Sequence, residues 1–231
     1  MGRLSRRRML VGLGLAATGL GCGGANPFLL PYIFSGGESK TPAEFPLTPH
    51  AKKPDVKVVV FVSARTGLAP DLAGVDRMLN AELINALEAN VKANEQKVQV
   101  LKMPKIDEYK SQNPNWRSVH PCEMGKAVAD GTDYVIDIEI QEMDLFKPGT
   151  RGQWLQGRAT VSVNAYDLTK PLKDPVYKLD VPFESPGGEM EKESAYQLST
   201  FRMNFVQFIA RGIAAKFTDT TPKVGRFRDG T

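Results

Sequence analysis

The sequence predicts an α/β (α+β) fold with the element order β-α-β-α-β-β-β-α. We expect a mixed sheet with an antiparallel meander and covering helices. Two observations predict it. A continuous apolar, β-branched run at residues 57–62 is typical of a central strand covered on both faces, and a helical stripe follows it. Later in the chain, three segments alternate apolar and polar residues, which is typical of half-buried strands.

In the first half of the predicted domain, Asp71 is expected to cap a helix that runs to about Asn94. Its apolar positions recur every three or four residues and form one stripe: Leu72, Val75, Leu79, Leu83, Leu87 and Val91. Residues 98–101 read as a short second strand. The polar stretch that follows is expected to hold one helical turn around residues 106–109. Ser118 or His120, with Pro121 in the first turn, then starts a short helix that stops at Gly131.

The second half alternates at residues 133–141, 159–166 and 177–183, which predicts three strands. Pro182 has no N–H to donate to a ladder, so the last strand is expected at an edge of the sheet. A closing helix is expected from Ser194 to about Phe217. Its buried stripe is predicted to contain Leu198, Phe201, Phe205, Phe208, Ile209 and Ile213.

Residues 1–21 have the pattern of a secretory signal peptide. A basic head from Gly2 to Arg8 precedes the apolar run Met9–Ala17, which is shorter than the roughly 20 residues of a membrane span. Ser5–Leu10 also resembles the twin-arginine export motif, with Met9 where that motif usually has Phe. An ordinary basic head region is the alternative, so the export route stays open.

Cys22 resembles the lipobox cysteine of bacterial lipoproteins, whose thiol is acylated after cleavage. Gly21 fits the position before it, whereas Leu20 and Gly19 depart from the usual order. The resemblance implies a lipid anchor at Cys22 with several acyl chains, such as palmitate, and multiple chains give stable membrane attachment. An ordinary signal that happens to contain a cysteine and a Cys22–Cys122 disulfide are the alternatives.

Residues 22–55 are expected to form a lipidated, Pro-rich tether, because six prolines between 27 and 54 prevent a helix. The apolar segments Phe28–Leu30 and Tyr32–Phe34 are expected either on the membrane surface or docked on the domain. The domain itself is expected at residues 56–218, and a polar tail at 219–231.

Charge argues against a nucleic-acid partner. The chain has 30 Lys and Arg against 26 Asp and Glu, and the first 21 residues carry four arginines and no acid, so the remainder is balanced. Nucleic-acid binding needs clustered basic residues.

The sequence also shows no clear metal-binding or catalytic motif. His120, Cys122 and Glu123 have poor spacing for one metal ion, and no second cluster completes four ligands. Several carboxylates follow one strand (Asp137, Glu139, Glu142 and Asp144), where an exposed strand face explains them as well as a cation site does. No catalytic, cofactor-binding or metal residue is therefore predicted.

The segment Met124–Ile136, a short helix, a Gly-containing turn and a strand that opens with Asp133-Tyr134, resembles part of a group of envelope lipoproteins. The group includes the curli-secretion lipoprotein, the lipoprotein activators of penicillin-binding proteins and the amino-terminal domain of the Tol-system propeller protein. The resemblance extends over residues 56–218 by topology and implies an accessory or scaffolding role. The connections 143–156 and 167–176 are too short for the membrane-spanning hairpins of a secretion pore.

Together these observations predict a lipid-anchored protein of the cell envelope that works by contact with an envelope protein partner. Trp116 and Trp154, both expected in loops, and Tyr177 are the candidate partner contacts. A ligand- or lipid-binding carrier is the alternative, and a hydrolase or metal-dependent enzyme is a third class. A large apolar cavity between the sheet and the closing helix would favour the carrier.

Overall fold

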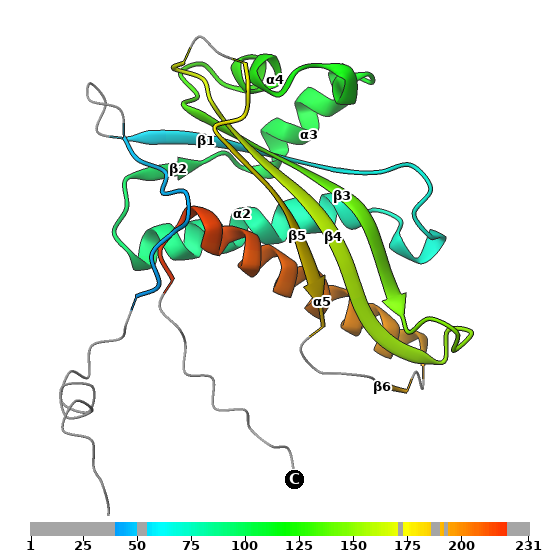
Figure 1. The fold of residues 1–231 in the computed structure, drawn as a ribbon. Helices are drawn as coiled ribbons and strands as arrows, with labels where there is room; N and C mark the ends of the chain where they lie inside the picture. Colours follow the sequence, from blue (N-terminus) through cyan, green and yellow to red (C-terminus); the bar gives the residue numbers. More distant parts are fainter. Residues whose placement is uncertain (1–39, 50–54, 171–172, 186–189, 192–193, 221–231) are drawn as a thin grey trace, which may run out of the picture. The chain divides into compact units, whose positions relative to one another are not determined.

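The computed structural model describes residues 40–49, 55–170, 173–185, 190–191 and 194–220. The predicted signal peptide, Cys22, the Phe28–Phe34 segment and residues 221–231 lie outside the described residues. The fold class is confirmed, because strands and helices form a mixed six-stranded sheet with covering helices (Figure 1).

The sheet has the strand order β2-β1-β3-β4-β5, with β6 paired to one end of β4. Its strands are β1 (Val56–Ala64), β2 (Val98–Val100), β3 (Tyr134–Phe146), β4 (Trp154–Asp167), β5 (Tyr177–Glu184) and β6 (Met190–Glu191). β1 runs parallel to both β2 and β3, whereas β3, β4 and β5 form the predicted antiparallel meander.

Two pairs of helices cover the two faces of the sheet. The long helices α2 (Val75–Ala93) and α5 (Ala195–Phe217) pack on one face. The short helices α3 (Met103–Gln112) and α4 (Pro121–Val128) lie on the other face, toward one end of the sheet (Figure 1). A single turn of 3-10 helix, η2 (Pro70–Leu72), precedes α2, and another, η3 (Trp116–Ser118), lies between α3 and α4.

The main core lies between the sheet and the α2/α5 pair. Alternate residues of β1, β3 and β4 share this face by register and are fully buried, for example Val60, Ile136 and Ala165. The predicted apolar stripe of α2 is buried, and α5 buries Phe205, Ile209 and Ile213, which leaves Leu198, Phe201 and Phe208 half-buried. Apolar residues at every second position of the strands therefore pack against apolar residues at every third or fourth position of the helices. This is the core that the spacing of apolar residues in the sequence predicted.

Two expectations for the first half were wrong in detail. Asp71 does not cap α2, because it lies in η2 and the cap position is Gly74 at φ 74°, a left-handed conformation that separates the two helices. The polar stretch after β2 forms the whole helix α3 rather than one turn. Ile106 and Tyr109 of α3 are buried, and this packing supports a helix that the polar sequence alone does not indicate.

The predicted starts of the two later helices at His120, one of the two residues considered, and Ser194 are confirmed, and each helix is capped by that side chain. The Nδ1 of His120 accepts a hydrogen bond from the N–H of Cys122 at the start of α4, which ends at Val128, before Gly131. The Ser194 hydroxyl accepts from the N–H of Gln197 at the start of α5. Both bonds satisfy N–H groups that the first turn of a helix leaves unpaired.

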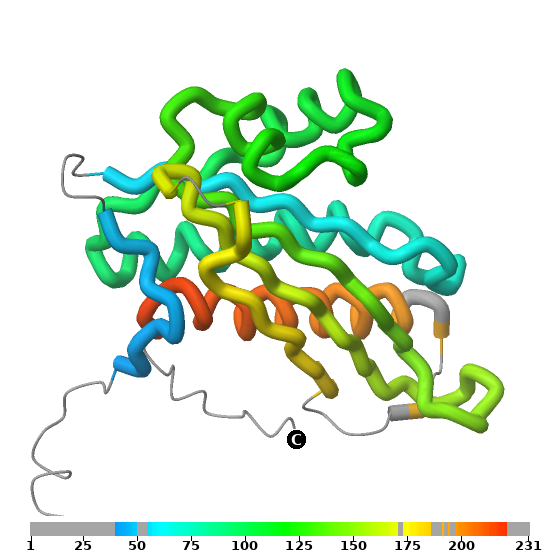
Figure 2. The backbone as a smooth tube through the Cα atoms, turned by 45° about the horizontal axis from the view of Figure 1, so that its top comes forward, coloured from blue at the N-terminus to red at the C-terminus, as the bar shows by residue number. Residues whose placement is uncertain are grey.

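Residues 40–49, which we call the strap, lie along the last turns of α5 (Figure 2). Thr41 and Thr220 exchange backbone hydrogen bonds of 2.8 and 3.0 Å. The N–H groups of Phe45 and Leu47 donate to the carbonyls of Lys216 and Phe217. This part of the segment that we expected to form a tether therefore belongs to the folded unit.

Candidate functional site

The strap is held by a polar contact that involves Tyr177, one of the predicted partner contacts. The Glu44 carboxylate accepts a hydrogen bond from the Tyr177 hydroxyl at 2.9 Å and pairs with the Lys216 ammonium at 2.5 Å. The hydrogen bond from Lys216, and to a smaller extent that from Tyr177, lowers the pKa of Glu44. Burial and the bond to Glu44 raise the pKa of Tyr177 to about 12.

Aromatic packing also holds the strap on the domain. The centroid of the Phe45 ring lies 5.6 Å from the ring centroid of Tyr177, 6.1 Å from that of Tyr134 and 6.3 Å from that of Phe217. Leu47 is buried, and the Tyr134 hydroxyl donates to the carbonyl of Thr48 at 3.3 Å. Tyr177 therefore holds the strap on the domain, in addition to any contact it makes with a partner.

Trp116 lies in η3 rather than in a loop, and its side chain is buried. Its ring stacks on that of Phe61 at 6.2 Å. The Lys110 Nζ lies 4.3 Å from the Trp116 ring centroid and donates to the carbonyl of Val62 at 3.1 Å. The indole is thus enclosed between α3 and the sheet.

Trp154 is the first residue of β4 rather than a loop residue, and it is opposite Glu191 of β6. With 38% of its surface exposed, it is one of two large hydrophobic side chains exposed in the described chain; Met203 is the other. Of the three residues expected to contact a partner, Trp154 presents the largest exposed apolar surface.

Asp137 of β3 is a half-buried carboxylate on the sheet face that α3 covers, and the sequence did not distinguish it from the other carboxylates of that strand. Burial, followed by the charge of Glu139, raises the pKa of Asp137 to about 6, and Lys110 opposes this rise. Burial also lowers the pKa of Lys110. The two groups approach each other only because α3 folds onto this face, so no local sequence signal could have paired them.

The residues of the suspected metal cluster are used for packing and capping. His120 caps α4, burial raises the pKa of the Cys122 thiol, and Glu123 forms an ion pair with Lys173 at 2.7 Å. Within the described ranges, no three His, Cys, Asp or Glu side chains come together as metal ligands. Across the same ranges, no helix has the length and hydrophobicity needed to cross a membrane.

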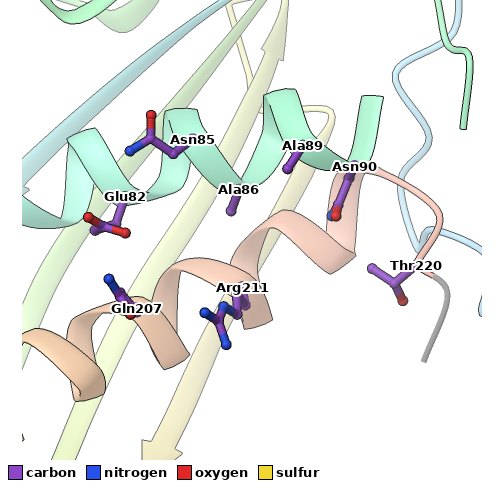
Figure 3. Close-up of a pocket in the computed structure, with 8 residues that line it drawn as sticks. All are labelled: Glu82, Asn85, Ala86, Ala89, Asn90, Gln207, Arg211 and Thr220. Carbon is purple, nitrogen blue, oxygen red and sulfur yellow. The ribbon is translucent and has the colours of Figure 1, made fainter. Parts of the chain in front are cut away.

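A groove of about 490 Å³ separates the outer sides of α2 and α5 (Figure 3). Six of its eight lining residues are polar or charged; the lining comprises Glu82, Asn85, Ala86, Ala89, Asn90, Gln207, Arg211 and Thr220. At one end the Asn90 side chain donates to the Thr218 hydroxyl at 2.9 Å. Amide and guanidinium groups along an open groove can hydrogen-bond to a polar partner, whereas an apolar ligand is normally enclosed.

No protein-family model matches the sequence, and no curated protein matches it. Solved structures with a similar arrangement include the PelC dodecamer from Paraburkholderia phytofirmans, at 14% identity and a TM-score of 0.39 over 78% of this chain and 97% of that chain. The hypothetical protein CT253 from Chlamydia trachomatis has 15% identity and a TM-score of 0.45 over 70% and 95%. Lipoprotein GNA1162 from Neisseria meningitidis has 12% identity and a TM-score of 0.41 over 67% and 98%. Several of the similar structures are bacterial lipoproteins.

Proposed function

We propose that this protein is exported, lipidated at Cys22 and attached to a membrane of the cell envelope, where it is a non-catalytic accessory or scaffolding module. The residues that support the anchor are the basic head, the short apolar run and the Gly21-Cys22 pair. Within this proposal, the resemblance of residues 124–136 to the curli-secretion, penicillin-binding-protein activator and Tol-system group suggests the kind of assembly that it serves.

The single observation that carries this proposal is the attachment of the strap. Residues 23–39 lie between Cys22 and Lys40, and a fully extended chain of that length reaches at most roughly 60 Å. The strap then fixes the chain to α5 and β5 through Glu44, Phe45 and Leu47. A lipid at Cys22 would therefore hold a folded module at a bounded distance from the membrane.

The environment of the potentially reactive side chains supports a protein that binds a partner rather than an enzyme. Cys122 is buried with a raised pKa, which disfavours the thiolate that a nucleophile needs. His120 is engaged as a cap, and Lys110 lies on an aromatic ring. Residues of α5 fill the space toward the sheet, since Phe205, Ile209, Ile213 and Phe217 are at most 2% exposed. This filled core favours a contact module over a carrier.

Photo-crosslinking in intact cells tests the proposal. A photoreactive amino acid replaces the exposed Trp154, and the matched control places it at the exposed Lys126 on α4. We expect a crosslinked envelope protein from position 154, identified by mass spectrometry, and less of it from position 126. Equal products from both positions, or none from either, would contradict a contact role for Trp154. Substrate turnover by the purified protein that His120→Ala abolishes would favour an enzyme instead.

A further inference from the structure

The two edge strands of the sheet, β5 and β2, differ in how well they are protected against the addition of another strand. At β5, the N–H of Ser185 donates to the carbonyl of Gly157 in β4. Because backbone groups alternate along a strand, the N–H and C=O groups of the odd-numbered residues of β5 point toward β4, and those of the even-numbered residues point outward. Pro182 therefore removes a donor from the outer edge, and Lys178 and Asp180 place charges beside it. Proline and charge are common protections against strand addition.

β2, at the other edge, lacks this protection. The N–H of Val56 donates to the carbonyl of Lys97, and the N–H of Leu101 donates to the carbonyl of Val58. The N–H and C=O groups of Val98 and Val100 consequently point away from β1. In the described part of the chain, β2 pairs with β1 alone (Figure 1).

A groove of about 460 Å³ lies along this edge, between β2 and α2. Its apolar lining comes from Val91 of α2 and from Val98, Val100 and Leu101. By register, Val98 and Val100 share the sheet face of Val56 and Val58, the face that α2 covers. An extended segment placed beside β2 would thus find main-chain partners and, on alternate residues, an apolar surface.

The rim of the groove is basic. Lys92, Lys102 and Lys105 contribute to its lining, and Glu88, the single acid there, already pairs with Lys102 at 2.5 Å. Lys92 and Lys105 are exposed and form no ion pair within the described residues. Two exposed lysines that pair with no acid among the described residues therefore lie beside an open strand edge, where they complement a segment that carries carboxylates.

We infer that the β2 edge is a docking site for an acidic, extended segment of a partner protein, which adds as a strand beside Val98 and Val100. The inference deepens the proposed contact function. It locates the partner at β2 rather than at β5, and it assigns the partner an alternation of apolar and acidic residues.

Fluorescence anisotropy with the full chain carrying Cys22→Ala tests this inference. The probe is a labelled nine-residue peptide of alternating Glu and Val, and a peptide with Lys in place of Glu is its control. We expect saturable binding of the acidic peptide that weakens with added salt, and no binding of the basic one. Equal binding of both peptides, or of neither, would overturn the inference.

Variants distinguish the contribution of charge to peptide binding from that of backbone hydrogen bonds. The double variant Lys92→Glu/Lys105→Glu should weaken binding of the acidic peptide by roughly tenfold or more, since reversal replaces attraction with repulsion. Lys126→Glu/Lys178→Glu, at exposed positions outside the groove, should leave it unchanged. Val98→Pro removes an outward N–H without removing a bond to β1 and should also abolish binding. If both lysine pairs behave alike, the inference is wrong.

The crosslinking experiment, repeated with the photoreactive amino acid at the exposed Gln99 beside the β2 groove, keeps this inference distinct from the proposed function. If a partner is crosslinked in cells but Lys92→Glu/Lys105→Glu leaves its yield unchanged, the contact function stands and the β2 site falls. If the peptide binds as described but no envelope partner is recovered, the β2 site stands and the proposed function falls.

Discussion

Thr41 and Thr220 are joined by two backbone hydrogen bonds, 2.8 Å from the N–H of Thr41 and 3.0 Å from that of Thr220. This pair closes the folded unit, because it ties the segment before β1 to the segment after α5. The neighbouring contacts of Glu44, Phe45 and Leu47 extend the same junction along the last turns of α5. A domain that starts at residue 55 would lack it.

The strap should accordingly contribute to stability. Leu47→Ala removes a side chain that is 5% exposed, and we expect it to lower the free energy of unfolding by about 2–4 kcal/mol. Thr48→Ala, at an exposed neighbouring position, is the control and should have little effect. Urea unfolding of the two variants measures both values, and equal stabilities would contradict a structural role for the strap.

Gly125 is required by the packing of α4 on the sheet. A Cβ at this position would lie 2.2 Å from the Val135 Cγ2, so one of the two must move. We expect Gly125→Ala to destabilise the fold by roughly 1–3 kcal/mol, despite the higher helix propensity of Ala. Lys126→Ala, on the exposed side of the same helix, should be nearly neutral.

A double-mutant cycle checks the cause. If the clash with Val135 is responsible, Gly125→Ala and Val135→Ala together should cost less than the sum of the two single changes. Strict additivity would show that the glycine is needed for another reason.

Asn80 is an unusual core residue of α2. Its side chain is fully buried, and neither its amide nitrogen nor its oxygen has a hydrogen-bond partner in the described chain. An apolar side chain of similar size avoids this desolvation cost, so we expect Asn80→Leu to stabilise the protein by about 1–2 kcal/mol. Thermal unfolding should show a higher Tm than wild type, and a clear decrease would mean that the amide has a partner in solution.

Asp137 should make stability depend on pH. Its pKa is raised from 3.8 to about 6, chiefly by burial, so between these values the folded state binds more protons than the unfolded state. Stability from this group is therefore present below about pH 4 and is lost as pH rises through 6. We expect Asp137→Asn to be more stable than wild type by roughly 2–3 kcal/mol at pH 7 and nearly equal at pH 4. Urea unfolding at both pH values measures the difference, and a constant difference would contradict the raised pKa.

The sequence was sufficient for features that depend on local pattern. Alternation predicted the three antiparallel strands, the spacing of apolar residues predicted α2 and α5, and Pro182 indicated the edge position of β5. The starts of α4 near Pro121 and of α5 at Ser194 were also predicted from the local sequence. Each of these depends on neighbours within a few residues along the chain.

Features that depend on distant contacts could not be predicted in this way. α3 is helical because Ile106 and Tyr109 are buried, although most of the segment is polar. Trp116 is enclosed because Lys110 and Phe61 arrive from other elements. The strap and the β2 groove also combine residues far apart in sequence, and neither segment shows a motif of its own.

Mass spectrometry of the protein extracted from cell membranes measures the lipid anchor at Cys22 directly. We expect a mature chain that begins at an acylated Cys22, and we expect that Cys22→Ala no longer stays firmly with the membrane fraction. A mature chain with an unmodified Cys22, or firm membrane retention of the Cys22→Ala protein after cleavage, would contradict the anchor on which the proposed function rests.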